Sequence, residues 1–177
     1  MNIEDLELCG AKILSFEVKN DSRGSFSRHY CCETLESVGL PSHWPQGNIS
    51  TNTHPHTMRG IHFQKFPYEE PKIVRCCNGS MVDVIVDLQK ESPTYLKHQC
   101  IELNENDGKA VFVPAGFGHA FITLQENTKV LYLMGEKHNQ SASFGIRWND
   151  ESIGIDWPVE PKHISKQDQS WPDFIPN

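Results

Sequence analysis

The chain has 177 residues, with 16 Lys and Arg against 23 Asp and Glu, which gives a formal net charge of −7. This length fits one domain, residues 1–177, that can bury a sizeable core. The acidic balance argues against broad binding to nucleic acid or to an anionic membrane, but it leaves room for a local cluster of Arg and Lys that reads one phosphorylated small molecule.

The lack of a recognisable targeting signal and the spacing of the cysteines predict a cytoplasmic protein. No apolar run approaches the roughly 18 residues that span a bilayer, and the acidic N-terminus lacks the pattern of a signal peptide. The six cysteines include the adjacent pairs Cys31-Cys32 and Cys76-Cys77 but no C-x-x-C spacing. This is a poor framework for disulfides or zinc, so we expect reduced thiols packed as small apolar groups.

Helical signals are few and lie away from the middle of the chain. Glu33–Val38 predicts a short helix that ends at Gly39. In the proline-rich tail, Ser165–Ser170 predicts a single turn with Ser165 as its N-cap. We therefore expect the helices to be short and peripheral.

The middle of the chain predicts β-strands joined by tight turns. Lys72–Cys77 and Ser80–Leu88 flank Asn78-Gly79, which is a strong signal for a two-residue hairpin. Two later strand pairs with turn residues between them repeat this pattern: Gln99–Leu103 with Ala110–Val113, and His119–Leu124 with Val130–Met134.

In one of these strands the side chains alternate between two faces. In Ser80–Leu88 the even-numbered residues from Val82 to Leu88 share one face, and the odd-numbered residues from Met81 to Asp87 share the other. Strands at a spacing of about 8–12 residues with turn signals indicate a sandwich or barrel. We predict an all-β jelly roll, a double-stranded β-helix, because its core can hold a small-molecule cavity between two sheets.

Several polar residues fall on or beside these strands. If Ile61–Phe63 is strand, His62 faces the same way as Gln64 and lines a cavity. Lys72, His119, Tyr132 and Asp168 are further candidates. Each has an ordinary alternative, such as a satisfied core histidine, a solvated lysine or aspartate, or a core tyrosine. The functional hypothesis depends on their joint pattern.

The joint pattern is similar to a metal-binding cupin whose ligands have been replaced. His62, Lys72 and Gly79 stand where such a cupin has His-x-His, then Glu, six residues and Gly, and Pro114–His119 stands where it has Pro-x-Gly-x-x-His. Gln64 replaces the second His, and Lys72 replaces the Glu. An ammonium group repels a divalent cation and suits an anionic oxygen. We therefore expect acid–base chemistry with no metal or other cofactor.

A rival metal constellation is also present. His54-Pro55-His56 has His-x-His spacing, Glu69 and Glu70 follow, and His119 supplies a possible third histidine ligand. The proline between the two histidines favours a loop. A metal-dependent cupin that acts as an oxygenase or isomerase thus stays an alternative.

Across nearly its whole length the chain resembles the dTDP-4-dehydrorhamnose 3,5-epimerase family of nucleotide-sugar enzymes. The resemblance rests on blocks that occur in order: Asp21–Phe26, Gln46–Ser50, Arg59–Gln64, Lys72–Arg75, Asp83–Leu88, Pro114–Phe121, Gly145–Trp148, Gly154–Pro158 and Ile164–Asp168. It implies a metal-free cupin jelly roll, usually a homodimer, that epimerises a nucleoside-diphosphate 4-keto-6-deoxyhexose beside its ketone for deoxysugar and polysaccharide biosynthesis.

The resemblance also implies roles for single residues. His62 and Asp168 match a base dyad, Tyr132 matches the acid on the opposite face, and Lys72 and His119 match residues around the ketone. Positions that match substrate contacts are Arg23, Arg59, Gln46 and Asn48, with Phe26 as an aromatic near the base. A family-like dimer brings Arg23 near the cavity of the partner.

These roles agree with the chemistry of the side chains. A C–H group next to a ketone becomes acidic when a cation such as Lys72 stabilises the enolate. A neutral imidazole has suitable basicity near pH 7 to take the proton. Arg23 and Arg59 would hold a diphosphate through charge-assisted bonds.

Two positions depart from the family pattern. Arg28 stands where the family usually has Glu, and His138 stands where many members have Tyr. Because both match the substrate end, the nucleotide stays open with dTDP as the default. A single-centre epimerase, acting at C3 only or C5 only on another nucleotide sugar, is the main alternative, and a catalytically silent sugar-binding module is a further one.

Overall fold

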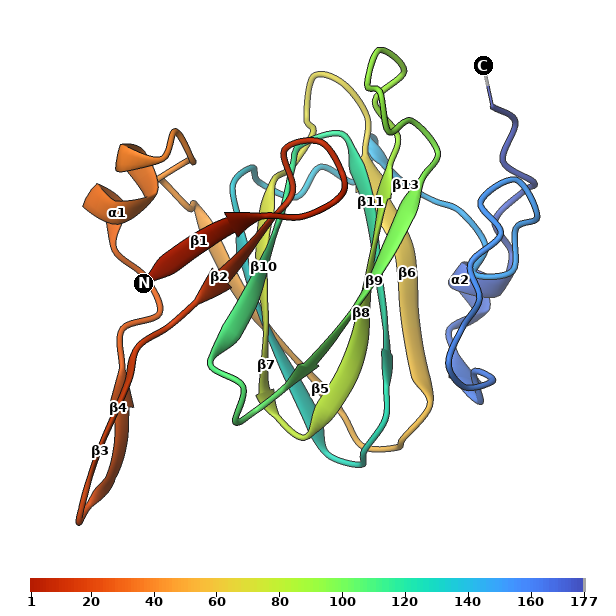
Figure 1. The fold of residues 1–177 in the computed structure, drawn as a ribbon. Helices are drawn as coiled ribbons and strands as arrows, with labels where there is room; N and C mark the ends of the chain where they lie inside the picture. Colours follow the sequence, from red (N-terminus) through yellow and green to blue (C-terminus); the bar gives the residue numbers. More distant parts are fainter. Residues whose placement is uncertain (177) are drawn as a thin grey trace.

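The computed structural model describes residues 1–176, and β-strands dominate this part of the chain (Figure 1). The elements are β1 (Asn2–Asp5), β2 (Lys12–Ser15), β3 (Val18–Asp21), β4 (Gly24–Ser27), α1 (Cys32–Ser37), β5 (Gln46–Asn52), β6 (Thr57–Gln64), β7 (Lys72–Asn78), β8 (Ser80–Asp87), β9 (His98–Asn104), β10 (Lys109–Val113), β11 (Phe117–Thr123), β12 (Thr128–Met134), β13 (Ser143–Gly145), β14 (His163–Ile164) and α2 (Lys166–Gln169).

Within residues 1–176 the strands form two larger sheets and one separate hairpin. Sheet I has the strand order β1-β2-β10-β7-β12-β5. Sheet II has the order β13-β6-β11-β8-β9, with β14 beside β6, and β3 pairs only with β4. From β5 to β8 and again from β10 to β12, consecutive strands alternate between the sheets. This alternation makes the fold a jelly roll, which confirms the predicted fold class with its short peripheral helices.

The three expected hairpins are wrong. Strand β7 pairs with β10 and β12, whereas β8 pairs with β9 and β11. The partners in the other two expected pairs, β9 with β10 and β11 with β12, also lie in different sheets. A turn signal reports only that the chain reverses. Here the strands before and after each turn bury their inner faces against each other across the sandwich.

The space between the sheets is partly filled by an apolar core. Val74 and Cys76 of β7 meet Met81 and Ile85 of β8 there, and all four are buried. Full burial of such side chains stabilises the fold by about 1.5–3 kcal/mol each. The even-numbered valines of β8 face the opposite way, into a second apolar cluster, so the predicted alternation of β8 is confirmed.

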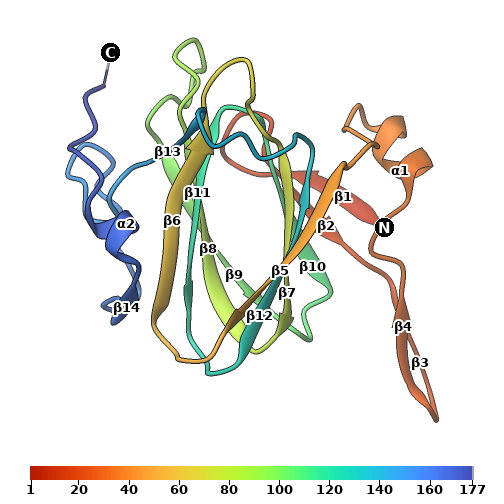
Figure 2. The same cartoon turned by 180° about the vertical axis from the view of Figure 1, so that it is seen from behind.

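Flanking segments cover the outer face of each sheet (Figures 1 and 2). The chain that follows β13 lies along sheet II and places Ile146 and Ile153 against the valines of β8. On the other side, Leu35 of α1 packs with Leu14 and Phe112 of sheet I. The predicted helices are both present, and Ser165 caps α2 by accepting a hydrogen bond from the backbone N–H of Asp168 at 3.0 Å.

The β3–β4 hairpin projects away from the sandwich, on the side opposite α2 (Figures 1 and 2). It makes no sheet pairing with the other strands of residues 1–176, and its Phe26 side chain is 71% exposed. The hairpin therefore exposes an aromatic side chain, Phe26, and a cationic one, Arg23, to solvent. No helix of residues 1–176 has both the length and the apolar character to cross a bilayer.

Candidate active site

A polar hollow lies beside the apolar core, between the two sheets. Its volume is about 420 Å³, and β5, β6, β7, β11 and β12 all contribute to its lining. The sequence candidates that line it are Asn48, Arg59, His62, Lys72, His119, Tyr132 and His138. The fold thus gathers side chains that are up to 90 positions apart in the chain, from Asn48 to His138.

A bulge in β6 directs both Arg59 and His62 into the hollow. Simple alternation would place residues three positions apart on opposite faces. Here His62 pairs with His119, and Arg59 pairs with Phe121, so three steps along β6 match two along β11. At the bulge, Gly60 has φ +114°, and a Cβ atom there would lie 2.6 Å from the Cβ of Ala120. A side chain at this position does not fit.

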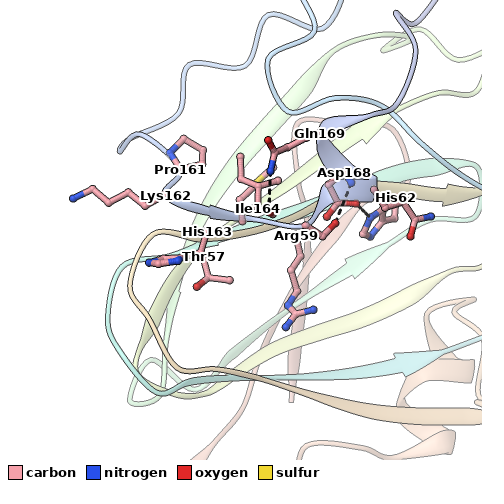
Figure 3. A pocket seen from close by; sticks show the side chains of 12 residues that line it. Thr57, Arg59, His62, Pro161, Lys162, His163, Ile164, Asp168 and Gln169 are labelled. Atoms are coloured by element: carbon pink, nitrogen blue, oxygen red, sulfur yellow. Dashed lines mark hydrogen bonds and ion pairs between the residues drawn. The ribbon is translucent and has the colours of Figure 1, made fainter.

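His62 pairs with Asp168 of α2 (Figure 3). The distance from Nε2 of His62 to Oδ1 of Asp168 is 2.7 Å. The Asp168 side chain is 5% exposed, whereas that of His62 is 44% exposed. The carboxylate is therefore fixed under the imidazole, while the imidazole stays accessible.

Asp168 remains a carboxylate despite its burial. Burial raises the pKa of Asp168, but the hydrogen bond and the charge of His62, together with bonds from Ser165 and the backbone N–H of Gly60, outweigh it. The net result is a pKa below the usual value for Asp. An ionised Asp168 holds the His62 ring in place through the hydrogen bond to Nε2.

Tyr132 reaches the hollow from β12 of sheet I, and its ring contacts His119 and Phe121 of β11 in sheet II. Its ring packs edge-on against His119, with ring centroids 5.9 Å apart. Burial raises the pKa of Tyr132, the charge of Asp83 raises it further, and Arg59 partly opposes both. The phenol is therefore protonated at neutral pH and can donate a proton.

Lys72 forms a buried ion pair inside the hollow. Its Nζ lies 3.2 Å from Oε1 of Glu70, and the two side chains are 5% and 9% exposed. Glu70 also lines the hollow. A buried ammonium needs a partner of opposite charge, and Glu70 supplies it.

His119 has its own carboxylate partner. Its Nε2 lies 2.7 Å from Oδ1 of Asp83, and both side chains are buried. The second oxygen of Asp83 is buried and has no hydrogen-bond partner among residues 1–176. His119 and His62 thus share one arrangement, in which a carboxylate holds each imidazole through Nε2.

Hydrogen bonds hold two further candidates, Arg59 and Gln46, in or near the hollow. The guanidinium Nε of Arg59 donates to Oδ1 of Asn52 at 2.9 Å, which orients the side chain. Gln46 does not line the hollow itself, but its Oε1 accepts a hydrogen bond from the backbone N–H of His138 at 2.6 Å. Gln46 thereby fixes the loop that brings His138 to the rim.

Arg23, Phe26 and Arg28 lie outside the hollow of their own chain. All three sit on or beside the projecting β3–β4 hairpin and are exposed. Within the part of the chain that the structure describes, Arg23 forms an ion pair only with the nearby Asp21, at 2.6 Å. The substrate-binding role expected for these residues stays a prediction.

A larger hollow of about 740 Å³ lies on the other side of β6, between that strand and the segment that holds β14 and α2 (Figure 3). Arg59 and His62 line both hollows. This outer hollow was not predicted, because the segment that forms it lies about 100 residues after β6 in the chain.

The donors of the rival metal set are not assembled. No group of three or more His, Cys, Asp or Glu among residues 1–176 has the geometry to hold a metal ion. His54 stacks on His163, with centroids 4.6 Å apart, while His119 bonds to Asp83 and Glu70 pairs with Lys72. Each of these groups already has a different partner.

Sequence reasoning did not assign two carboxylates their place in the site: Glu70 was considered only as a metal ligand, and Asp83 was not a candidate. Glu70 stands two positions before Lys72, so an extended chain directs both side chains the same way. Asp83 stands on the face of β8 that was predicted to be shared with Met81 and Ile85. In both cases a charged residue on an inward face was the available signal.

Comparison with known proteins agrees with this site. A jelly roll with carboxylate-supported imidazoles on one sheet and a lysine and a tyrosine on the other defines an isomerase-type cupin. A family model described as dTDP-4-dehydrorhamnose 3,5-epimerase matches residues 5–175. The chain belongs to this family.

Individual relatives carry the same name or a related one. A dTDP-4-dehydrorhamnose 3,5-epimerase of Sinorhizobium fredii is 34% identical, with 98% of this chain and 90% of the relative covered. A dTDP-4-dehydrorhamnose 3-epimerase of Streptomyces niveus is 31% identical, with 96% and 82% covered. The crystal structure of the Bacillus anthracis 3,5-epimerase with TDP and PPi bound is 34% identical, has a TM-score of 0.94, and is matched over 98% of this chain and 99% of that chain.

Proposed function

We propose that this protein epimerises a dTDP-linked 4-keto-6-deoxyhexose at C3 and C5. Each inversion removes the proton from a carbon beside the C4 ketone and returns a proton to the opposite face. The names of the relatives support this substrate and this reaction.

The observation that carries the proposal is the opposition of His62 and Tyr132. His62 enters the hollow from sheet II and Tyr132 enters from sheet I. A sugar ring held between the sheets would present one face to each residue. Inversion of a carbon centre needs this arrangement, because proton removal and proton return occur on opposite faces.

His62 acts as the base in this mechanism. Its Nε2–H donates to Asp168, which leaves Nδ1 unprotonated and able to accept the C–H proton. The imidazolium that forms is stabilised by the ionised Asp168. Two electrons from the broken C–H bond pass into the enolate.

Lys72 stabilises the enolate, and Tyr132 completes the inversion. The ammonium of Lys72 donates to the oxygen that gains negative charge, with His119 beside it. Tyr132 then gives its phenolic proton to the carbon from the other face. The raised pKa of Tyr132 keeps that proton available at neutral pH. Before the next cycle, His62 must lose a proton to water and Tyr132 must regain one.

The substrate's diphosphate and nucleoside extend from the hollow toward its rim. Arg59, Asn48 and Gln46, with His138 nearby, are the contacts that one chain supplies. We further propose a homodimer in which the hairpin of one protomer brings Arg23, Phe26 and Arg28 to the hollow of its partner. The projection of the hairpin and the exposure of Phe26 support this assembly.

The domain organisation and the cellular location of the protein are also part of this proposal. We infer that the chain acts as one domain, because one apolar cluster joins residues from Leu8 to Val130. A cytoplasmic location is supported by the six cysteines, all of which are free thiols.

A single-centre epimerase is the second candidate, because the Streptomyces niveus relative is named a 3-epimerase. Incubation of the protein with dTDP-4-keto-6-deoxyglucose in deuterated water separates the two. The proposal expects deuterium at both C3 and C5, whereas incorporation at one carbon supports the single-centre enzyme. No exchange at either carbon, with dTDP or with any other nucleotide, overturns both.

A thermal-shift panel of dTDP, UDP, GDP and CDP tests the nucleotide. A ligand that binds only the folded state stabilises it by about 2.7 kcal/mol at 100 times its Kd. We expect dTDP to raise the melting temperature most. A larger shift with another nucleotide assigns Arg28 and His138 to recognition of a different base.

A further inference from the structure

The buried ion pair of Glu70 and Lys72 places a negative charge inside a hollow proposed to bind an anionic enolate. Glu70 offsets the buried charge of Lys72, but a carboxylate that lines the hollow is also placed to contact the substrate. Glu70 lines the hollow and is 9% exposed, and its Oε1 lies 3.2 Å from Nζ of Lys72.

The backbone fixes both charged groups. Glu70 and Lys72 are two positions apart on either side of Pro71, so they face the same way. The carbonyl of Pro71 accepts a hydrogen bond from the N–H of Gly135 at 2.8 Å. A Cβ atom on residue 135 would lie 2.5 Å from Cγ of Pro71. This close contact leaves the segment little freedom to move.

Both groups keep unused hydrogen-bonding capacity. Lys72 has three N–H donors, and Glu70 has a second oxygen, Oε2. Within residues 1–176, Lys72 and Glu70 have no side-chain partner other than each other. Oε2 is also absent from the buried polar atoms that lack a partner, which agrees with its opening into the hollow.

We propose that Glu70 and Lys72 together recognise the α-hydroxyketone edge of the sugar. Lys72 donates to the C4 ketone oxygen, and Glu70 accepts a hydrogen bond from the hydroxyl on C3. This assignment rests on the proposed function and adds Glu70 as a specificity-determining substrate contact.

The spacing of the pair supports this pairing. A ketone oxygen and a hydroxyl on the adjacent carbon lie side by side, one an acceptor and the other a donor. A cationic donor and an anionic acceptor 3.2 Å apart present the complementary set. A site made only of cations would bind the ketone but would leave the C3 hydroxyl without an acceptor.

The contact also has a consequence for inversion at C3. Epimerisation at that carbon moves its hydroxyl from one side of the ring to the other. Because the backbone fixes Glu70, its carboxylate bonds one configuration better than the other. Glu70 therefore favours one C3 epimer in the bound state, while C5 inversion leaves this contact unchanged.

The test compares the parent sugar nucleotide with its 3-deoxy analogue. The analogue keeps the C4 ketone and the C5 proton, so deuterium exchange at C5 reports kcat/KM for both substrates. With the unmodified protein we expect removal of the hydroxyl to lower kcat/KM roughly 10- to 100-fold, as for loss of a hydrogen bond to a charged group. With Glu70→Met, which has no carboxylate, we expect the two substrates to differ by less than about threefold.

Matched variants give the controls. Glu70→Gln keeps a neutral acceptor. Its ratio of kcat/KM between the parent substrate and the 3-deoxy analogue should therefore fall between the ratios of the unmodified protein and of Glu70→Met. Glu69→Gln removes the same charge one position earlier, outside the hollow, and should keep the ratio of the unmodified protein. Because each ratio compares two substrates on one enzyme, a reduced folded fraction cancels.

Two failures are distinguishable. The first failure concerns Glu70. If the unmodified protein exchanges C5 of the parent substrate, but its ratio of kcat/KM between parent and 3-deoxy analogue equals the ratio of Glu70→Met, the assignment of Glu70 is overturned. The proposed function then stands. If the unmodified protein exchanges neither substrate, the proposed function itself is wrong.

Discussion

His62 and His119 are direct cross-strand partners on β6 and β11, and a carboxylate 2.7 Å away holds each imidazole through Nε2. The two carboxylates come from different places, Asp168 from α2 and Asp83 from β8. His62 is accessible and His119 is buried. Sheet II thus presents two supported imidazoles, and the ammonium of Lys72 and the phenol of Tyr132 stand on sheet I.

Tyr132→Phe should separate proton exchange from inversion. The variant keeps the aromatic ring but loses the proton donor on the face opposite His62. We expect inversion at C3 and C5 to fall by about 10²–10⁴-fold. Deuterium should still enter from the face of His62 with retention of configuration. NMR in deuterated water measures both.

His62→Phe is the matched comparison, because it removes the base. Both exchange and inversion should fall in this variant. A Tyr132→Phe protein that inverts its substrate at the rate of the unmodified protein contradicts the role of Tyr132.

Asp168→Asn should lower activity and change the pH dependence of stability. The pKa of Asp168 is depressed in the folded protein, so its carboxylate stabilises the fold above the unfolded pKa of about 3.9. This contribution is lost as the pH falls through the folded pKa. Urea unfolding should therefore show the unmodified protein to be more stable than the variant at pH 7, with the difference shrinking below about pH 4.

The control for this change is Asp156→Asn, an exposed carboxyl without a hydrogen-bond partner in the described chain. It should show little difference at either pH. Turnover of Asp168→Asn should fall by about 10²-fold or more, because the base loses its ionised partner. Full activity of this variant would place the pair outside the mechanism.

Mixed dimers test the role of the β3–β4 hairpin. Arg23→Ala removes a cation from the hairpin, and His62→Phe removes the base from the hollow, so each protein alone should be inactive or nearly so. If the hairpin serves the partner's hollow, a mixed dimer contains one site with both residues intact. Random mixing should restore about a quarter of the unmodified activity.

Absence of any restored activity after subunit exchange, verified by mass spectrometry, is the result that contradicts sharing of the hairpin. If the Arg23→Ala homodimer is itself active, Arg23 is not required for turnover.

Gly60→Ala should disrupt the β6 bulge. The added Cβ would lie 2.6 Å from both the Cβ of Ala120 and the carbonyl oxygen of His119, at φ +114°. We expect a loss of about 1–3 kcal/mol in the free energy of unfolding and a larger relative loss of activity, because Arg59 and His62 both depend on the bulge. Gly154→Ala also has a positive φ, but its nearest neighbour is 3.7 Å away, so it should retain activity. Equal activity losses in the two variants would contradict this account.

Local patterns predicted the elements better than their pairing. The alternation in Ser80–Leu88 correctly grouped the side chains that share a face, and the structure turns the odd-numbered face inward and the even-numbered valines outward. The turn at Asn78-Gly79 correctly predicted a reversal, but not that β8 would join the opposite sheet. Sheet membership depends on which distant strands offer a complementary edge, and short-range sequence does not contain that information.

The site shows the same division. The inward direction of His62 followed from strand alternation, whereas the inward direction of Arg59 depends on a bulge that alternation does not predict. Asp168 came from the family resemblance alone, because nothing local links a tail residue to β6. Glu70 was considered only as a metal ligand, since its neutralisation by Lys72 becomes visible only in three dimensions.

The contact between His62 and Asp168 joins residues 106 positions apart. Asp168 arrives on the segment that lies along the outer face of sheet II, and it takes no part in the pairing of β7, β8, β11 and β12. Local detachment of α2 alone would keep the pairing of these strands, while the imidazole lost its support. A protease cut between β13 and α2 should therefore abolish turnover before it lowers the melting temperature. Loss of catalysis would then report detachment of the C-terminal segment more sensitively than global unfolding does.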